Sequence, residues 1–95
     1  MDDISRLRLF RLIRPMPTVL RIRGYRFYFY ALEGTEPPHV HVDKGPGTIK
    51  LWLRDLSIAR MEGLKPAEIR EVLRLTREHH HHLLTAWHEF EGRKS

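Results

Sequence analysis

The sequence predicts a single α+β domain in which an antiparallel sheet comes first and a long helix follows. From residue 18 to residue 54, apolar and polar side chains alternate with a period of two, as in strands with one buried face. From Pro66 to about Glu91, apolar residues recur every three or four positions, as on one face of a helix. The 95 residues, 41% of them hydrophobic, suffice for one core and are too few for two.

Four alternating segments make up the predicted sheet, residues 18–23, 25–30, 39–43 and 48–53. Gly24 and the Lys-Gly-Pro-Gly turn at 44–47 separate neighbouring segments. The connections are too short for parallel crossovers of about a dozen residues, so we expect a four-stranded antiparallel meander. Its apolar face, expected to be the core, consists of Leu20, Ile22, Phe27, Phe29, Val40, Val42, Ile49, Leu51 and Leu53.

The remaining elements are predicted to be helical. Asp55 can cap a short connecting helix over Leu56–Glu62, which Gly63 would end. Pro66 is suited to the first turn of the long helix. One stripe of that helix is expected to pack on the sheet: Ile69, Val72, Thr76, Leu83, Trp87 and Phe90. Four histidines, His79–His82, lie inside it and radiate around the helix, so they are interpreted as structural.

Positive charge is concentrated in the first third of the chain. Residues 1–30 hold seven of the 17 lysines and arginines but only two of the 12 acidic residues, so the net charge of +5 arises there. Clustered positive charge favours a polyanion or an acidic protein as partner. We interpret residues 1–15 as a basic extension and residues 16–95 as the domain. Deleting the extension is expected to leave a folded domain with weaker, less salt-sensitive polyanion binding.

Several classes of protein are disfavoured by composition. No stretch approaches the roughly 18 apolar residues of a membrane span, and the N-terminus lacks the order of a signal peptide, so a cytoplasmic protein is expected. The absence of cysteine excludes disulfides and thiolate metal sites. Histidine, aspartate and glutamate are the remaining candidate metal ligands.

Several segments from Met16 to about Gly92 carry a family resemblance: MPTVLRIRGYRFYFY, EPPHVHV, KLWL and LLTAWHEF. They resemble a small bacterial family known as domain of unknown function 4160, and EPPHVHV is the most specific of them. The resemblance implies the same fold over essentially the whole domain. It also implies loci of toxin–antitoxin type, and hence a small toxin-type or antitoxin-type protein as partner.

His39 and His41 share one face of one predicted strand, about 6.5 to 7 Å apart. With Glu36 or Asp43 as third ligand they could hold a divalent metal, which is the alternative of a metal-dependent enzyme. Without a metal, one histidine could act as base and the other as acid in nucleolytic catalysis. The alternation aims both away from the core, so replacing either by alanine is expected to change stability by no more than about 0.5 kcal/mol. A third interpretation makes them hydrogen-bonding partners of the Glu-Pro-Pro segment at 36–38.

The face opposite the predicted core interleaves cations with aromatic rings. Its members are Arg21, Arg23, Arg26, Tyr28, Tyr30, His39, His41, Lys50, Trp52 and Arg54. Rings that stack on bases and guanidinium groups that contact phosphates commonly hold single-stranded nucleic acid on a sheet. The leading hypothesis is therefore a nucleic-acid-directed component of such a locus, binding or cleaving, with no cofactor. The same residue types dominate protein interfaces, so docking of a small neighbouring protein or a second protomer is the alternative.

Overall fold

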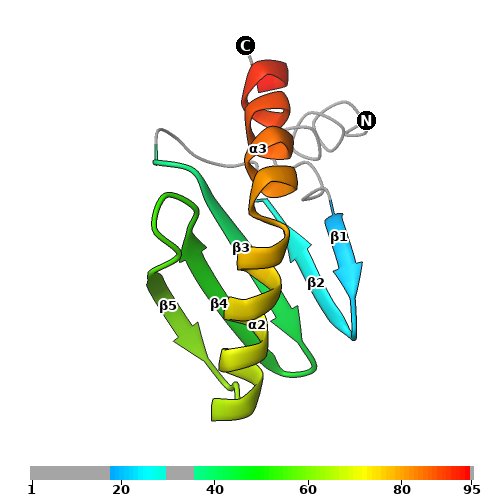
Figure 1. Ribbon diagram of the computed structural model, residues 1–95, viewed down its shortest axis with the longest axis vertical. Coiled ribbons are helices and arrows are strands. Elements are labelled where there is room, and N and C mark those ends of the chain that lie inside the picture. Colours follow the sequence, from blue (N-terminus) through cyan, green and yellow to red (C-terminus); the bar gives the residue numbers. More distant parts are fainter. Residues whose placement is uncertain (1–17, 30–35, 95) are drawn as a thin grey trace, which may run out of the picture.

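The computed structural model describes residues 18–29 and 36–94 (Figure 1). Its elements are β1 (Thr18–Ile22), β2 (Tyr25–Tyr28), β3 (His39–Lys44), β4 (Gly47–Trp52), β5 (Ile58–Glu62), α2 (Pro66–Glu78) and α3 (His80–Lys94). The five strands form one antiparallel sheet in chain order, and two helices follow. The predicted α+β class and the meander are confirmed, but the sheet has one strand more than expected.

β5 takes the place of the short connecting helix that the sequence predicted over residues 56–62. Leu56 has a φ of 61°, in the left-handed region, which is incompatible with the first turn of a right-handed helix. Its amide donates to the carbonyl of Trp52 at 2.8 Å, so the chain turns back beside β4. The carboxylate of Asp55 accepts from the amide and hydroxyl of Ser57 and thereby stabilises this turn instead of capping a helix.

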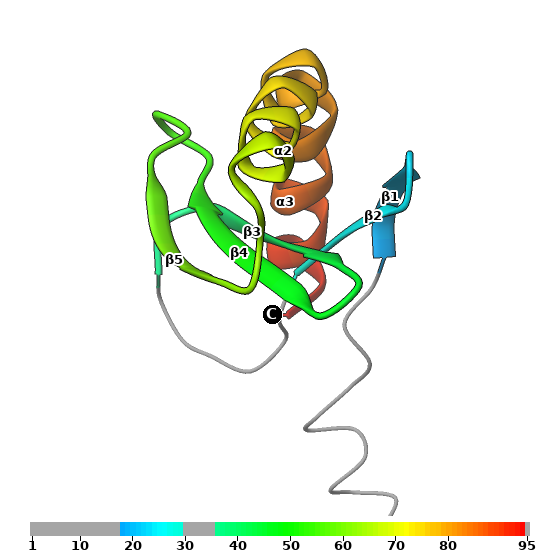
Figure 2. The same ribbon diagram turned by 90° about the horizontal axis from the view of Figure 1, so that it is seen from below.

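The single long helix that was predicted is divided at His79. This residue leaves helical geometry with φ −108° and ψ 21°, and its ring Nδ1 lies 3.0 Å from the carbonyl of Leu75. Backbone hydrogen bonds from His79 to Leu75 and from Leu83 to His79 continue across the break. Figure 1 accordingly shows α3 continuing from the end of α2. The division is a local kink at one residue, and both parts keep to the same face of the sheet (Figure 2).

The core lies between that face and the helices. Seven of the nine residues expected on the apolar sheet face are buried: Phe27, Phe29, Val40, Val42, Ile49, Leu51 and Leu53. The other two, Leu20 and Ile22 in edge strand β1, are half-buried against them. In the helices Val72, Thr76, Leu83 and Trp87 are buried as expected, and Ile69 and Phe90 are half-buried. Leu75 is also buried, although the predicted stripe omitted it.

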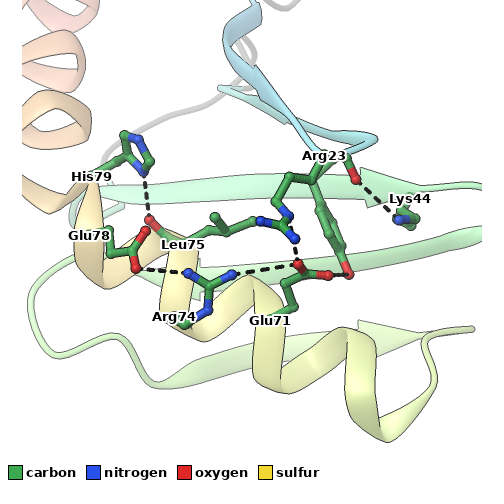
Figure 3. A network of polar contacts seen from close by, with 8 residues as sticks. Arg23, Lys44, Glu71, Arg74, Leu75, Glu78 and His79 are labelled. Atoms are coloured by element: carbon green, nitrogen blue, oxygen red, sulfur yellow. Dashed lines mark hydrogen bonds and ion pairs between the residues drawn. The ribbon is translucent and has the colours of Figure 1, made fainter.

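A polar network ties the β1–β2 hairpin to α2 (Figure 3). The carboxylate of Glu71 accepts a hydrogen bond from the Tyr25 hydroxyl at 3.1 Å and pairs with Arg23 at 3.0 Å. Arg74 bridges Glu71, at 3.6 Å, and Glu78, at 2.8 Å. Burial, followed by the hydrogen bond to Glu71, raises the pKa of Tyr25 to about 12. Tyr25 is therefore a neutral donor that fixes Glu71 against the hairpin.

Two histidines of the 79–82 run tie α3 to the sheet. The ring Nε2 of His80 hydrogen-bonds the backbone carbonyl of Leu53, just after β4. The ring Nε2 of His82 lies 3.3 Å from the carbonyl of Val19 in β1. One carbonyl belongs to edge strand β1 and the other to the residue after β4. These contacts connect α3 to two separate strands of the sheet, which agrees with a structural role for the run.

Candidate functional site

Cross-strand pairing defines the outer face, the side of the sheet opposite the helices. Its members are Thr18, Arg21, Arg26, Tyr28, His39, His41, Asp43, Thr48, Lys50, Trp52, Arg60 and Glu62. His41 lies at its centre, between Tyr28 of β2 and Lys50 of β4. The next paired position along β3 places Asp43 between Arg26 and Thr48. Polar and aromatic side chains therefore run across several strands in register.

Two cations lie over aromatic rings on this face. The guanidinium of Arg26 is 4.4 Å from the ring centroid of Tyr28, and its Nε donates to the hydroxyl of Thr18 at 2.8 Å. The ammonium of Lys50 is 4.8 Å from the ring centroid of Trp52. Cation–π contacts hold long side chains flat against a sheet, so the positive charge stays close to the rings.

His39 is buried, with 7% of its surface exposed, although the alternation places it on the outer face. Its Nδ1 lies 2.9 Å from the carbonyl of Pro37, so this nitrogen carries the proton and donates. Its ring centroid is 5.8 Å from that of Trp52 and 4.9 Å from that of Trp87 in α3. The expectation that this histidine is a surface residue is wrong, and its hydrogen bond agrees with the third interpretation, that it holds the 36–38 segment.

His41 is also buried, with only 6% of its surface exposed, which again corrects the expected exposure. Its ring stacks on Tyr28, with centroids 5.4 Å apart and planes 21° apart, because both belong to neighbouring strands in direct register. Burial lowers the pKa of His41 to about 4, and the neighbouring His39 ring, Lys50 and Arg60 act in the same direction. At neutral pH the imidazole of His41 is therefore uncharged.

The two carboxylates proposed as metal ligands are engaged by other side chains. Asp43 accepts from the Tyr28 hydroxyl at 3.0 Å. Glu36 accepts from Lys50 at 2.6 Å, which lowers the pKa of the Glu36 carboxyl, and it lies 3.6 Å from Nδ1 of His39. Within residues 18–29 and 36–94, no three histidine or acidic side chains are grouped so that they could hold a metal ion. The arrangement therefore gives the metal-dependent alternative no support.

A comparison with protein families decides the identity of the fold. The profile described as "Domain of unknown function (DUF4160)" matches residues 24–88, more than half of the chain. The chain belongs to the DUF4160 family. The resemblance seen in the sequence is thus confirmed. No curated protein and no solved structure is significantly similar to the chain.

The DUF4160 domain does not bring every predicted site residue onto the outer face. Arg21 lies on it and is exposed. Arg23 lies in the β1–β2 turn with a positive φ of 54° and pairs with Glu71 on the helix side. Arg54 is exposed in the turn after β4. Tyr30 and the basic extension at 1–15 lie outside the described residues.

Arg60 is the outer-face cation that the sequence interpretation missed. In the β4–β5 register it lies directly opposite Lys50. It is exposed and adds to the positive charge near His41. It was missed because residues 56–62 were predicted to be helical. The alternation of Met61 between Arg60 and Glu62 was a short strand signal that could have found it.

In the described part of the DUF4160 domain, neither helix has the length and apolar content that crossing a membrane requires.

Proposed function

We propose that the outer face of this DUF4160 domain binds single-stranded nucleic acid, with Trp52 as a platform on which a base stacks. Trp52 is half-buried, so part of this residue is accessible to solvent, and Lys50 would move off its ring for a base to stack there. The cations around it would contact the phosphates on either side of the stacked base. This is the nucleic-acid-directed role in a toxin–antitoxin type locus that the sequence suggested, reduced to binding.

The observation that carries the proposal is the composition of the outer face. Arg21, Arg26, Lys50 and Arg60 provide four cations, whereas Asp43 and Glu62 are the acidic members of the set. Both carboxylates lie in one cross-strand row, beside Arg26 and Thr48. The row containing Tyr28, His41, Lys50 and Arg60 has no acidic member, although Glu36 pairs with Lys50 at 2.6 Å from outside the row, and its Tyr28 and His41 are buried. The accessible part of the face combines the exposed Arg21 and Arg60 with the half-buried Arg26, Lys50 and Trp52, and positive charge beside an aromatic ring suits a strand of phosphates and bases.

Binding is favoured over cleavage by the state of the histidines. General acid–base catalysis works best when the pKa of the acting group lies near the working pH. The pKa of His41 is lowered to about 4, which makes this side chain a weak base and leaves no proton to donate at neutral pH. Nδ1 of His39 donates to the Pro37 carbonyl, so only Nε2 of this buried ring could act as a base. The pair is thus better suited to holding the face together than to catalysing hydrolysis.

Titration of labelled single-stranded RNA and DNA of about 12 nucleotides, followed by fluorescence anisotropy, tests the proposal. Trp52→Ala is expected to weaken binding by about 1 to 3 kcal/mol, the contribution of one stacked base. Arg60→Ala is expected to weaken binding and to reduce the slope of affinity against salt by about one phosphate contact. Arg70→Ala is the matched control, because Arg70 is exposed on α2 and its loss changes the net charge equally.

Equal affinities for the Trp52→Ala and Arg70→Ala variants would contradict the proposal. A loss of binding to a co-encoded small protein, with nucleic-acid affinity unchanged, would assign the outer face to protein docking, the second hypothesis. Deletion of residues 1–15 forms a separate arm. In this truncated chain, affinity should depend less on salt concentration, while Trp52→Ala should still weaken binding. That result would show that the basic extension adds affinity to a site that exists without it.

A further inference from the structure

The edge of the sheet at β5 is unlike the rest of the described surface. All five of its residues are exposed, from Ile58 to Glu62. Ile58 and Met61 are 42% and 43% exposed, and they are the large hydrophobic side chains that stand exposed within residues 18–29 and 36–94. Pairing with Leu51 and Ile49 of β4 places both on the helix side of the sheet. An unpaired edge that carries apolar side chains is a template for another strand.

The neighbouring flank of α2 extends this apolar edge. Glu71 faces the β1–β2 hairpin, since it contacts Tyr25 and Arg23. At about 100° per residue, Ile69 and Leu73 fall on the opposite flank of the helix from Glu71. That flank faces β5, because α2 lies over the middle of the sheet between the two edges (Figure 1). Ile69 and Leu73 are half-buried and therefore retain accessible apolar surface beside β5.

We propose that β5 pairs with β5 of a second copy of this chain, antiparallel and about a two-fold axis at Met61. The two sheets would join edge to edge. An axis perpendicular to the sheet would place the helices of both copies on one face and the two outer faces side by side. Each Met61 would contact its equivalent, close to the apolar flanks of the two α2 helices. The inference rests on the edge strand and the neighbouring flank of α2, and it shares Arg60 alone with the proposed nucleic-acid site, so Trp52→Ala tests nucleic-acid binding without changing the β5 contact.

The charges on β5 select the second copy as the occupant and fix the register. Arg60 and Glu62 both lie on the outer face, on either side of Met61. With the axis at Met61, Arg60 of each copy lies directly opposite Glu62 of the other, which gives two favourable cross-strand pairs. Moving the axis to position 60 sets arginine against arginine, and moving it to position 62 sets glutamate against glutamate. Of these three registers, only the one centred on Met61 is self-complementary.

The bulge in β5 limits how far the pairing extends. Lys50 pairs with Arg60 and Leu51 with Ile58, so Ala59 is the additional residue. The regular part of the edge is therefore residues 60–62, and we expect association in the micromolar to millimolar range, not an obligate dimer. Sedimentation velocity of the full chain without nucleic acid should show a monomer–dimer equilibrium. A chain that stays monomeric up to about 1 mM would overturn the proposal.

The register can be measured by single-cysteine crosslinking, because the chain has no cysteine of its own. Met61→Cys, Arg60→Cys and Glu62→Cys are compared with Thr85→Cys, an exposed position on α3. Only position 61 lies opposite itself in the proposed dimer, at a Cα separation that a disulfide can span. Met61→Cys should therefore form the covalent dimer fastest under mild oxidation. Fastest crosslinking at 60 or 62, or equal rates at all four positions, would overturn the register.

Charge reversal provides an independent test of the same contact. Arg60→Glu or Glu62→Arg alone would set like charges opposite each other and should weaken association about tenfold or more. Combining the two substitutions restores opposite charges and should return the dimer. Arg70→Glu is the control for net charge, because Arg70 is exposed on the side of α2 opposite the buried Val72, and it should leave association unchanged. If the double variant is folded by circular dichroism but does not recover association, the proposed pairing is overturned. Binding of β5 to a different polypeptide, without self-association, would also overturn it.

Discussion

The ring of His39, at the start of β3, lies 4.9 Å from the indole of Trp87 in α3, measured between centroids. His39 also pairs with Trp52 on the outer face, so it is in contact with both layers of the molecule. Trp87 in turn packs edge to face on Phe29, with centroids 5.2 Å apart. His39 therefore connects the candidate site to the core.

His39→Ala is expected to lower the free energy of unfolding by about 1 to 3 kcal/mol, because the carbonyl of Pro37 loses its donor and Trp87 loses a packing partner. Urea denaturation followed by tryptophan fluorescence measures this loss. His39→Asn is the matched variant, since its side-chain amide can replace Nδ1 as donor, and it should lose less. A change below about 0.5 kcal/mol for His39→Ala would mean that the residue behaves as a surface side chain.

The error over the two histidines shows what alternation can and cannot predict. A period of two correctly predicted which face His39 and His41 share, because successive side chains of a strand point to opposite sides. It could not predict their burial, because burial depends on which strand is central and on the size of the cross-strand neighbours. Tyr28 and Lys50 flank His41, and α3 brings Trp87 against His39.

The stability of the domain is expected to depend on the protonation of His41. Its pKa is about 4 in the folded protein and 6.5 without the fold, so between these values the unfolded chain binds more protons. The contribution of His41 to the free energy of unfolding should therefore be largest above pH 6.5 and should fall as the pH drops toward 4. The expected loss is roughly 2 kcal/mol after allowing for solvent screening. Urea midpoints at pH 7 and pH 4.5 measure it.

Comparison of variants isolates this contribution from the other histidines. His41→Gln should flatten the pH dependence, whereas His88→Gln, at an exposed position on α3, should leave it as in the wild type. Titration of the His41 ring by NMR gives its midpoint directly. A midpoint between pH 6 and 7 would contradict this prediction, because it would mean that water reaches the ring and that its burial does not disfavour the protonated form.

Glu71→Ala is expected to cost about 1 to 2 kcal/mol of stability, since it removes the acceptor of the Tyr25 hydroxyl and the partner of Arg23. The same substitution should lower the pKa of Tyr25 from about 12 while leaving it above 10, because burial is the larger cause of the shift. Chemical denaturation and ultraviolet absorbance titration measure the two effects. Glu78→Ala is the control, because it removes a more exposed i,i+4 pair with Arg74 and should cost no more than about 0.5 kcal/mol.

The turn that leads into β5 and the kink at His79 were missed for a different reason. The turn depends on φ 61° at Leu56, which residues other than glycine seldom adopt, and the kink depends on φ −108° at His79, a conformation that no residue type marks in the sequence. Pattern methods detect such positions when glycine or proline marks them. The turn at 44–47, where glycine does mark the positive φ of Gly45, was predicted correctly.

Gly47→Ala tests how the segment after β5 is held against the sheet. A Cβ at Gly47 would lie 2.5 Å from a methyl of Leu64 and 2.6 Å from the carbonyl oxygen of Gly63. The methyl can move, but the carbonyl belongs to the backbone that leads from β5 into α2, so we expect a loss of about 1 to 3 kcal/mol. Gly92→Ala is the matched control, because no atom lies within 4 Å of its added Cβ and the residue is in α3. It should be neutral or stabilise by up to about 1 kcal/mol. Thermal unfolding should therefore shift to a lower temperature for Gly47→Ala and stay the same or shift to a higher temperature for Gly92→Ala. A Gly47→Ala protein as stable as the wild type would show that the chain after β5 is not packed against the β3–β4 turn, and the edge strand used in the proposed dimer would then lose its support.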